Sequence, residues 1–239
     1  MNYILLFLLL LFITVISMLE FEYKQEKEKE QKEVLVAKKE QKLVKKARVS
    51  TKKKKFYSLL LPAVQETHSN LMNEYIQISS DINKSENIQR IKELKQIYKV
   101  QSDKELLLAL KPHPQSIVIA QAAMESAWGT SRFFREANNI FGMWSANKNE
   151  ARIAAGKQRD GNRTIWLRRF DSVKDSVKAY YKLIATAKAY KELRETRYRT
   201  NDPYEIVKKL DKYSELGEKY TKELASVMRY NELTKYDKQ

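Results

Sequence analysis

The chain has 239 residues, a formal charge of +16 and a composition that is 43% hydrophobic and 32% charged. It contains no cysteine, which excludes disulfides, thiolate metal sites and cysteine nucleophiles. Its five glycines and four prolines are too few for an all-β protein with many tight turns, so we predict a mainly helical one. The two histidines, His68 and His113, leave little room for a histidine-rich metal centre, and we expect neither a metal nor an organic cofactor.

The N-terminal segment, residues 3–19, is apolar and carries no charged side chain. This run is at the short end of the ~17–25 residues that span a bilayer as a helix. Because no A-x-A cleavage pattern follows it, we predict that residues 1–19 form an uncleaved transmembrane anchor, and a cleaved signal peptide is the alternative. Either interpretation places the rest of the chain outside the cytoplasm.

Residues 20–56 form a second zone that lacks glycine and proline and is dense in lysine, glutamate and glutamine. These residue types favour helix, but the apolar positions are too sparse for a sustained coiled-coil seam. We therefore predict a solvated, partly helical stalk that acts as a spacer. As an alternative role, Lys52–Lys55 would contact anionic lipid or wall polymer.

The remainder, residues 57–239, is predicted to be one packed helical domain. Apolar residues recur at helical spacing within Phe56–Ile78 and again within Ile88–Tyr98, which predicts two helices. Ser102–Glu105 has the pattern of a capping box before the apolar run Leu106–Leu110, which predicts a third.

Later segments add further helices and one small β element. Asp160–Asn162 is a turn signal before the alternating run Thr164–Phe170, which predicts a short strand or a small hairpin. Ser172 and Asp202 are placed as N-caps of helices, and a final helix is expected from about Gly217 to Leu233.

The chemically informative helix is predicted from Gln115 to about Trp128, with Gly129 ending it. It is apolar almost all round, which is typical of a buried central helix, yet it contains Glu125. Burial raises the pKa of a carboxyl group, as a general acid near neutral pH requires. Helical spacing places Gln121 and Trp128 on the face of Glu125. From spacing alone, the alternative is a buried glutamate satisfied by a neighbouring arginine or tyrosine.

Several ordered motifs resemble those of a known family. They are E-S-A-W-G at Glu125–Gly129, N-N-I-F-G at Asn138–Gly142, F-D-S with a later serine and tyrosine over Phe170–Tyr180, and K-Y-S with a later tyrosine over Lys212–Tyr220. Over most of residues 56–233 the chain resembles the glucosaminidase family that cleaves bacterial peptidoglycan, glycoside hydrolase family 73, and especially its Bax-type branch.

The resemblance implies a lysozyme-like helical domain with a small β-hairpin lobe beside a cleft. It also implies an endo-β-N-acetylglucosaminidase that acts on the glycan strands of peptidoglycan, with Glu125 as the catalytic acid. Tyr213 matches a tyrosine of the family's active site, where it would hold the N-acetyl group or the attacking water. Four further positions match candidate substrate-binding residues, for which core packing or turn hydrogen bonds are the alternatives: Trp128, Asn139, Phe141 and Tyr220.

The sequence departs from the family at the second carboxylate. Glycosidases commonly use two carboxylates, ~5–9.5 Å apart depending on the stereochemistry, and many members of this family place a second glutamate on the β-lobe strand. No glutamate occurs within residues 160–168. Asp160 and Glu150 are the nearby substitutes; otherwise the substrate's own acetamido group assists, or the activity is reduced.

The strong positive charge raises the question of the partner. No nucleic-acid motif accompanies it, and an anchored or secreted chain would not meet nucleic acid. Peptide carboxylates of the wall and anionic lipids fit a cationic surface better. We therefore predict a monomeric, membrane-anchored peptidoglycan hydrolase of the bacterial cell envelope that uses Glu125 without a metal. The alternatives are a non-catalytic envelope scaffold that keeps the cleft, and a lytic transglycosylase.

Overall fold

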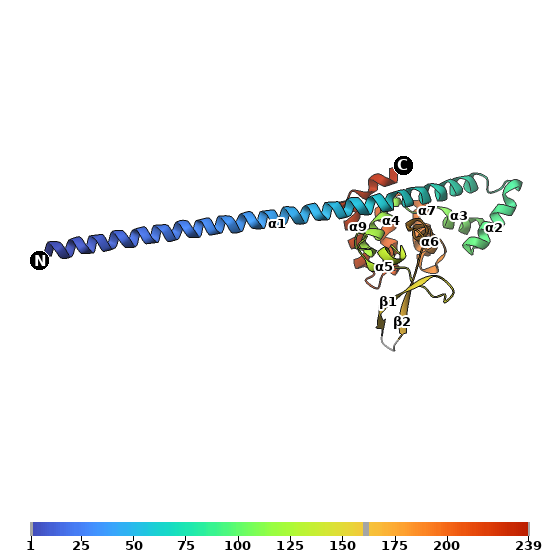
Figure 1. Ribbon diagram of the computed structural model, residues 1–239. Coiled ribbons are helices and arrows are strands. Elements are labelled where there is room, and N and C mark those ends of the chain that lie inside the picture. The colour runs from blue at the N-terminus through green and yellow to red at the C-terminus, as the bar shows by residue number, and fades with distance from the viewer. Residues whose placement is uncertain (1, 160–162, 239) are drawn as a thin grey trace. The chain divides into compact units, whose positions relative to one another are not determined.

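The computed structural model describes residues 2–159 and 163–238 (Figure 1). Side chains are described from residue 47 onward outside 157–163, and at scattered earlier positions. The predicted turn Asp160–Asn162, and with it one candidate for the second carboxylate, lies outside the described residues.

The first of two compact units, Met1–Thr51, is helical throughout its described residues. It belongs to the first helix, α1 (Asn2–Ser80). In the predicted anchor, residues 3–19, only the side chain of Met18 is described. No helix among the described residues has a stretch both long and apolar enough to cross a membrane, and the anchor stays a prediction.

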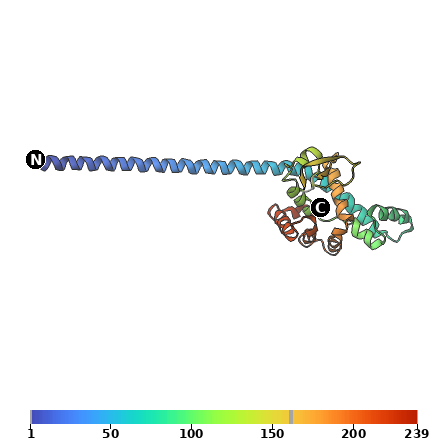
Figure 2. The same ribbon diagram turned by 90° about the horizontal axis from the view of Figure 1, so that it is seen from below.

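The second unit, Lys52–Gln239, is a group of helices with one small β hairpin (Figures 1 and 2). The prediction of a mainly helical protein with a small hairpin is therefore confirmed. Short 3₁₀ segments join several of the helices. After α1 the elements are α2 (Ile88–Tyr98), α3 (Asp103–Leu110), α4 (Gln115–Glu125), α5 (Arg132–Ala137), β1 (Arg152–Arg159), β2 (Arg163–Arg168), α6 (Val173–Thr186), α7 (Lys191–Arg199), α8 (Pro203–Val207), η3 (Lys208–Tyr213), α9 (Glu218–Tyr230) and η4 (Leu233–Lys238).

Helix α4 is buried at the centre of this unit, as its sequence predicts. Ile117, Val118, Ile119, Ala120 and Ala122 are each fully buried, whereas Met124 and Glu125, at the end of the helix, are only partly buried. The helix packs against α9 and η4, and side chains of α1 and α6 complete the same core. A helix that is apolar on every face is stable only in such a position.

A second, smaller apolar cluster lies at the other end of the unit. It joins the end of α1 to α2, α3 and α6 through residues that include Ile78, Leu94, Leu106 and Leu110. Seen from below, α2 and α3 lie away from the C-terminal helices, which are drawn in red (Figure 2). The unit therefore has two adjacent cores, with α6 contributing to both.

The helix starts that the sequence predicts are confirmed by their hydrogen bonds. The N–H of Glu105 donates to Ser102 Oγ at 3.2 Å, and the N–H of Ser102 donates to Glu105 Oε2 at 3.1 Å, which completes the capping box of α3. Ser172 caps α6 and Asp202 caps α8 through their side-chain oxygens.

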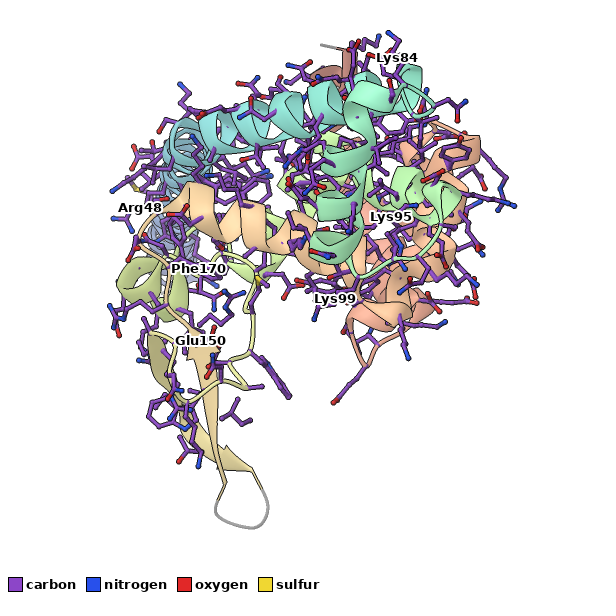
Figure 3. The ribbon with its side chains drawn as sticks, turned by 90° about the vertical axis from the view of Figure 1, so that its right-hand side faces the viewer. Arg48, Lys84, Lys95, Lys99, Glu150 and Phe170 are labelled. Atoms are coloured by element: carbon purple, nitrogen blue, oxygen red, sulfur yellow. The ribbon has the colours of Figure 1, made fainter. Side chains whose placement is uncertain are left out.

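The hairpin pairs β1 with β2 in an antiparallel register, Ile153 opposite Leu167. A bulge interrupts the ladder after Ala154, where Gly156 has a φ of +80°. Figure 3 shows the hairpin projecting away from the helices. The predicted strand is confirmed as β2. The position of its hairpin partner, β1, was not predicted, because Arg152–Arg159 shows no clear alternation of apolar and polar residues.

Candidate active site

The site is built at the C-terminal end of α4, which stops at Glu125, three residues earlier than predicted. A Schellman motif ends the helix: the N–H of Trp128 donates to Ala123 O at 2.8 Å, and the N–H of Ala127 donates to Met124 O at 3.3 Å. Ala127 takes the left-handed position that glycine usually occupies, with a φ of 49°. The helix therefore ends before the glycine that the sequence singles out.

The turn after Glu125 is strained. Ala127, Trp128 and Gly129 have φ values of 49°, 59° and 75°, so three successive residues are left-handed. This conformation costs a non-glycine residue roughly 1–2 kcal/mol. Strain of this kind persists only where surrounding contacts hold it, and it is common at functional sites.

Ser126 and Gly129 provide those contacts. Ser126 is fully buried; its hydroxyl donates to Ala122 O at 2.6 Å and accepts from the Gly129 N–H at 2.9 Å. A Cβ on Gly129 would lie 3.3 Å from ring carbons of both Phe134 and Phe56. Ser126 and Gly129 of the E-S-A-W-G motif therefore fix the backbone that carries Glu125.

Tyr220 of α9 holds the Glu125 carboxyl group. The Tyr220 hydroxyl donates to Glu125 Oε1 at 2.9 Å, and the tyrosine itself is buried. Gln121, one turn before Glu125 on α4, donates Nε2–H to the Tyr220 oxygen at 3.0 Å. Because the tyrosine proton is directed at Glu125, Oε2 of that carboxyl group is left to carry a proton.

The same hydrogen-bond chain continues into the core. Tyr180 of α6 donates to Gln121 Oε1, so its oxygen accepts from His113 Nε2, 3.1 Å away. Burial, then the charges of Arg197 and His68, hold the pKa of His113 well below its usual value, and the ring is neutral. Every hydrogen bond of this series is therefore donated in the same direction, from His113 toward Glu125, where the series ends.

Burial also sets the protonation of Glu125. It raises the pKa of this carboxyl group above its ordinary value, while the hydrogen bond from Tyr220 acts in the opposite direction. Burial and then the charge of Glu125 raise the pKa of Tyr213 well above its usual value, so the two groups lie within electrostatic reach of each other. A carboxyl group with a raised pKa is suited to give up a proton near neutral pH.

Tyr213 lies beside Tyr220 and ends the segment η3. Its ring stacks on that of Tyr220, with centroids 5.6 Å apart and 13° between the planes. Its hydroxyl donates to the backbone oxygen of Phe141 at 3.1 Å. Three of the residues expected from the sequence, Glu125, Tyr213 and Tyr220, are therefore brought together in the structure.

Phe141 and Asn139, two of the expected substrate-binding residues, are instead shielded from solvent. Phe141 is 2% exposed and stacks on Tyr180 at 4.1 Å between centroids. Asn139 is 1% exposed, and its side-chain amide donates to Met143 O at 2.9 Å and Arg168 O at 2.8 Å. Their side chains support the loop before the hairpin, and direct contact with a substrate does not fit this burial.

Trp128 contacts α1. Its ring meets the edges of Phe56 and Tyr57 at 5.5 Å and 5.9 Å between centroids. The ammonium group of Lys53 lies 4.4 Å from the centroid of the Trp128 ring and donates to Asn231 Oδ1 at 2.6 Å. The tryptophan expected to shape a sugar subsite thus ties the strained turn to the first helix.

Neither candidate for the second carboxylate is joined to Glu125 by a described contact. Glu150 lies near the start of the hairpin (Figure 3), and its Oε2 pairs with Arg168 Nε at 3.1 Å. Asp160 is outside the described residues. Among the described side chains, Tyr220 is the hydrogen-bond partner of Glu125, and no carboxylate perturbs its pKa. Within the same residues, no group of three histidine, aspartate or glutamate side chains is placed to hold a metal ion.

The sequence placed Gln121 on the face of Glu125 but gave it no role, and it did not assign the other two inner members of the hydrogen-bond chain, Tyr180 and His113, to the site. Two signals were available: a glutamine one turn before Glu125 in an otherwise apolar helix, and a tyrosine that closes the F-D-S motif. His113 offers no such signal, because it is separated from Tyr180 by 67 positions in the sequence.

The glucosaminidase family model, described as mannosyl-glycoprotein endo-β-N-acetylglucosaminidase, matches residues 104–233. The chain is 34% identical to protein bax of Escherichia coli (strain K12) over 125 residues, which are 50% of this chain and 43% of that protein. The match thus spans less than half the length of the curated relative. Among solved structures, the catalytic domain of the autolysin Auto from Listeria monocytogenes is 19% identical, with a TM-score of 0.45 over 72% of this chain and 88% of that one. A peptidoglycan hydrolase from Sphingomonas sp. A1 is 18% identical, with a TM-score of 0.42 over 63% and 88%.

Proposed function

The chain belongs to the glucosaminidase family, and on this basis we propose that it is a peptidoglycan hydrolase, an endo-β-N-acetylglucosaminidase with Glu125 as its general acid. The observation that carries the proposal is the half-buried Glu125 carboxyl group, with a raised pKa and one oxygen held by Tyr220. It is the last residue of a buried helix and is followed by a turn that is held in a strained conformation.

The reaction begins with a proton transfer from Glu125. Its Oε1 accepts the hydrogen bond from Tyr220, so Oε2 carries the proton and gives it to the glycosidic oxygen. The bond from that oxygen to C1 of N-acetylglucosamine breaks, and the next sugar leaves as an alcohol. Water then adds to C1 and gives its proton to the Glu125 carboxylate, which returns Glu125 to its protonated starting state. Tyr220 stabilises the carboxylate formed in the first step.

The substrate's own acetamido group is the second participant. Glu150 forms an ion pair with Arg168, and among the described residues no carboxylate perturbs the pKa of Glu125. An acetamido oxygen that assists at C1 replaces the second carboxylate. Tyr213 donates its proton to Phe141 O and so presents oxygen lone pairs, which accept the acetamido N–H and orient the group.

A single carboxylate also favours a second candidate, a lytic transglycosylase. In that reaction the 6-hydroxyl group of N-acetylmuramic acid, rather than water, attacks C1 of the same sugar and loses its proton, while the bond from C1 to the next sugar breaks and that sugar leaves as an alcohol. The products separate the two, since a transglycosylase leaves an anhydro end and a hydrolase leaves a reducing sugar.

The test is digestion of purified peptidoglycan by the full-length chain, followed by borohydride reduction and mass spectrometry. We expect reduced N-acetylglucosamine ends from the wild type and none from Glu125→Gln. Glu86→Gln, at an exposed position on another segment, is the matched control and should cut like the wild type. Anhydro ends would support the transglycosylase. Folded protein that binds the polymer and cuts nothing would support the non-catalytic scaffold. Asp160→Asn and Glu150→Gln should each keep activity, and a loss of activity in either variant would indicate that this residue is the second catalytic carboxylate.

We further propose that residues 1–19 anchor the chain in the membrane and residues 20–56 act as a spacer for the domain 57–239. The uncharged apolar run and the charged stretch after it support this arrangement. Fractionation of cells should find the full-length chain with membranes, resistant to salt and released by detergent. Recovery of a shortened chain in the soluble fraction would instead indicate cleavage.

A further inference from the structure

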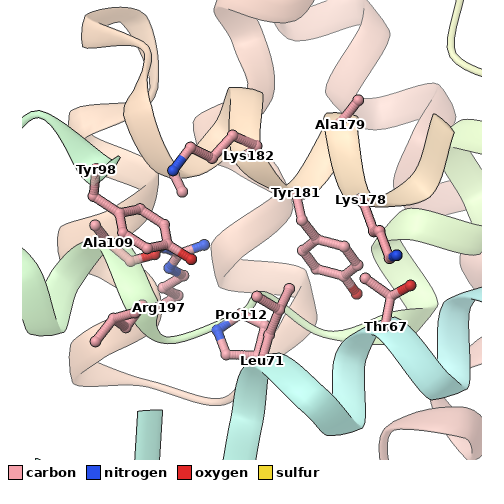
Figure 4. A pocket seen from close by; sticks show the side chains of 12 residues that line it. Thr67, Leu71, Tyr98, Ala109, Pro112, Lys178, Ala179, Tyr181, Lys182 and Arg197 are labelled. Atoms are coloured by element: carbon pink, nitrogen blue, oxygen red, sulfur yellow. The ribbon is translucent and has the colours of Figure 1, made fainter. Parts of the chain in front are cut away.

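A cavity of about 350 Å³ is lined by residues of α1, α2, α3, α6 and α7, and neither Glu125 nor Tyr220 is among them. It is formed where the two apolar cores of the helical unit adjoin. Its wall includes Leu71, Leu110 and Pro112 together with several polar groups (Figure 4).

Arg197 of α7 is the first of these polar groups, and it is 2% exposed. Its Nη2 donates to Leu108 O at 2.8 Å and to Ala109 O at 3.1 Å, at the end of α3, while Nε has no partner. Among the described residues no carboxylate forms an ion pair with it. Burial, and then the charge of Arg194, lower the pKa of Arg197 to about 9. A buried guanidinium group without a counter-ion is unusual, because charges are buried with partners.

Two hydroxyl groups on the same cavity also lack partners within the described residues. They are Thr67 Oγ1 and the Tyr181 hydroxyl, and both residues are 3% exposed. Figure 4 shows the two hydroxyls facing each other beside the ammonium group of Lys178. Three of the eight buried side-chain atoms found without a partner in the described part of the chain thus belong to this cavity. This concentration of unpaired polar atoms makes the cavity a candidate binding site, since buried polar groups in native proteins are usually satisfied.

The charge of the wall indicates which occupant. Lys178, Lys182 and Arg197 line the cavity, and no aspartate or glutamate does so among the described residues. Outside the lining, Asp175 pairs with Lys178 at 3.9 Å, and the charges of Glu74 and Asp237 reach Lys182 and Tyr181, whereas no carboxylate in the described part of the chain acts on Arg197. Lys182 donates to Ile97 O at 2.7 Å and lies 3.7 Å from the centroid of the Tyr98 ring, which fixes its charge at the rim. An anion would therefore meet cations and hydroxyl donors at its charged end and apolar walls around the rest.

We propose that this cavity binds a small ligand that ends in a carboxylate and has a compact apolar body. The mixture of neutral hydroxyl donors and apolar walls suits a carboxylate better than a strongly hydrated phosphate. Resting on the proposed function, the occupant is the carboxylate end of a D-alanine-containing peptide on the peptidoglycan strand. Its capture would give the enzyme a second contact with the polymer.

The experiment is calorimetric titration of full-length Glu125→Gln with N-acetyl-D-alanyl-D-alanine, in which no cleavage can occur. We expect saturable binding at one site. The C-terminal amide of the same dipeptide should bind at least about tenfold more weakly, a factor that corresponds to ~1.4 kcal/mol. Equal binding of the amide, competition by inorganic phosphate at the same concentration, or no binding would overturn the carboxylate site. Equal binding of the L,L-dipeptide would overturn its assignment to the wall peptide.

Two variants separate a ligand site from a structural role. Tyr181→Phe and Thr67→Val remove hydroxyls that have no partner, so each should melt at or above the temperature of the parent protein and bind the dipeptide several-fold more weakly. A lowered melting temperature with unchanged binding would show that the hydroxyls serve the fold and would contradict the site.

Dipeptide binding and cleavage of peptidoglycan are measured independently. Dipeptide binding by a wild type that does not cut peptidoglycan would leave the cavity standing and remove the proposed activity. Cutting without dipeptide binding would do the reverse.

Discussion

The substitution Tyr220→Phe tests how the site sets the acidity of Glu125. It removes the hydroxyl that donates to Glu125 Oε1 at 2.9 Å and leaves the ring that stacks on Tyr213. A hydrogen bond to a charged group contributes about 1.5–3 kcal/mol. One pKa unit corresponds to about 1.36 kcal/mol, so the loss should raise the pKa of Glu125 by about 1–2 units.

The sign follows from the protonated state that works. The hydrogen bond stabilises the carboxylate, so its removal makes Glu125 hold its proton to higher pH. Because a general acid is active while protonated, the alkaline limb of the rate profile should move upward by about 1–2 pH units. The maximal rate should fall, since the carboxyl group also loses its orientation and the Nε2–H of Gln121 loses its acceptor.

The assay is the rate of release of soluble fragments from peptidoglycan, measured as kcat/KM across the pH range in which the protein stays folded. Tyr213→Phe is the matched control: it also removes a tyrosine hydroxyl, but one that donates to Phe141 O rather than to Glu125. It should lower the rate and move the limb far less. An alkaline limb that stays in place or moves downward in Tyr220→Phe would refute the reasoning.

Three other outcomes follow from the buried groups. Gln121→Leu leaves the Tyr180 hydroxyl without its acceptor, so the unfolding free energy in urea should fall by about 1–3 kcal/mol and the rate should fall with it; an unchanged midpoint would argue against the hydrogen-bond chain. Burial lowers the pKa of His68 to about 4, against about 6.5 in the unfolded chain. The unfolded chain therefore binds a proton first as the pH falls, and the unfolding free energy should drop by about 2–3 kcal/mol between about pH 6.5 and pH 4. His68→Gln should flatten this part of the urea-measured profile, and an equally steep profile would contradict the role of His68. Gly129→Ala should lower the unfolding free energy by about 1–2 kcal/mol through its φ of 75°, whereas Ala127→Gly should raise it, and calorimetric melting temperatures in the opposite order would contradict the strained turn.

Local patterns were sufficient to predict much of the fold. Side chains that act within one turn of their own position, such as the caps at Ser102 and Ser172, need no tertiary information. The burial of α4 follows from its apolar residues on every face. Glu125 could be singled out from the sequence because burying a carboxyl group in an apolar helix is energetically costly.

Features that depend on distant contacts were not accessible from the sequence. The early end of α4 at Glu125 depends on packing that holds Ala127 in a left-handed conformation without a glycine. The hydrogen-bond chain from His113 through Tyr180 to Glu125 joins three parts of the sequence that only the fold brings together. Phe141 has the residue type of a sugar platform, and only its stack on Tyr180 shows that its ring lies in the core.

The most direct test of the central claim is one digestion of peptidoglycan in water labelled with heavy oxygen, reduced at once with borohydride. If Glu125 protonates the glycosidic oxygen and water completes the reaction, each new N-acetylglucosamine end carries one labelled oxygen, and Glu125→Gln produces none. Unlabelled anhydro ends, or labelled ends that persist in Glu125→Gln, would contradict the account.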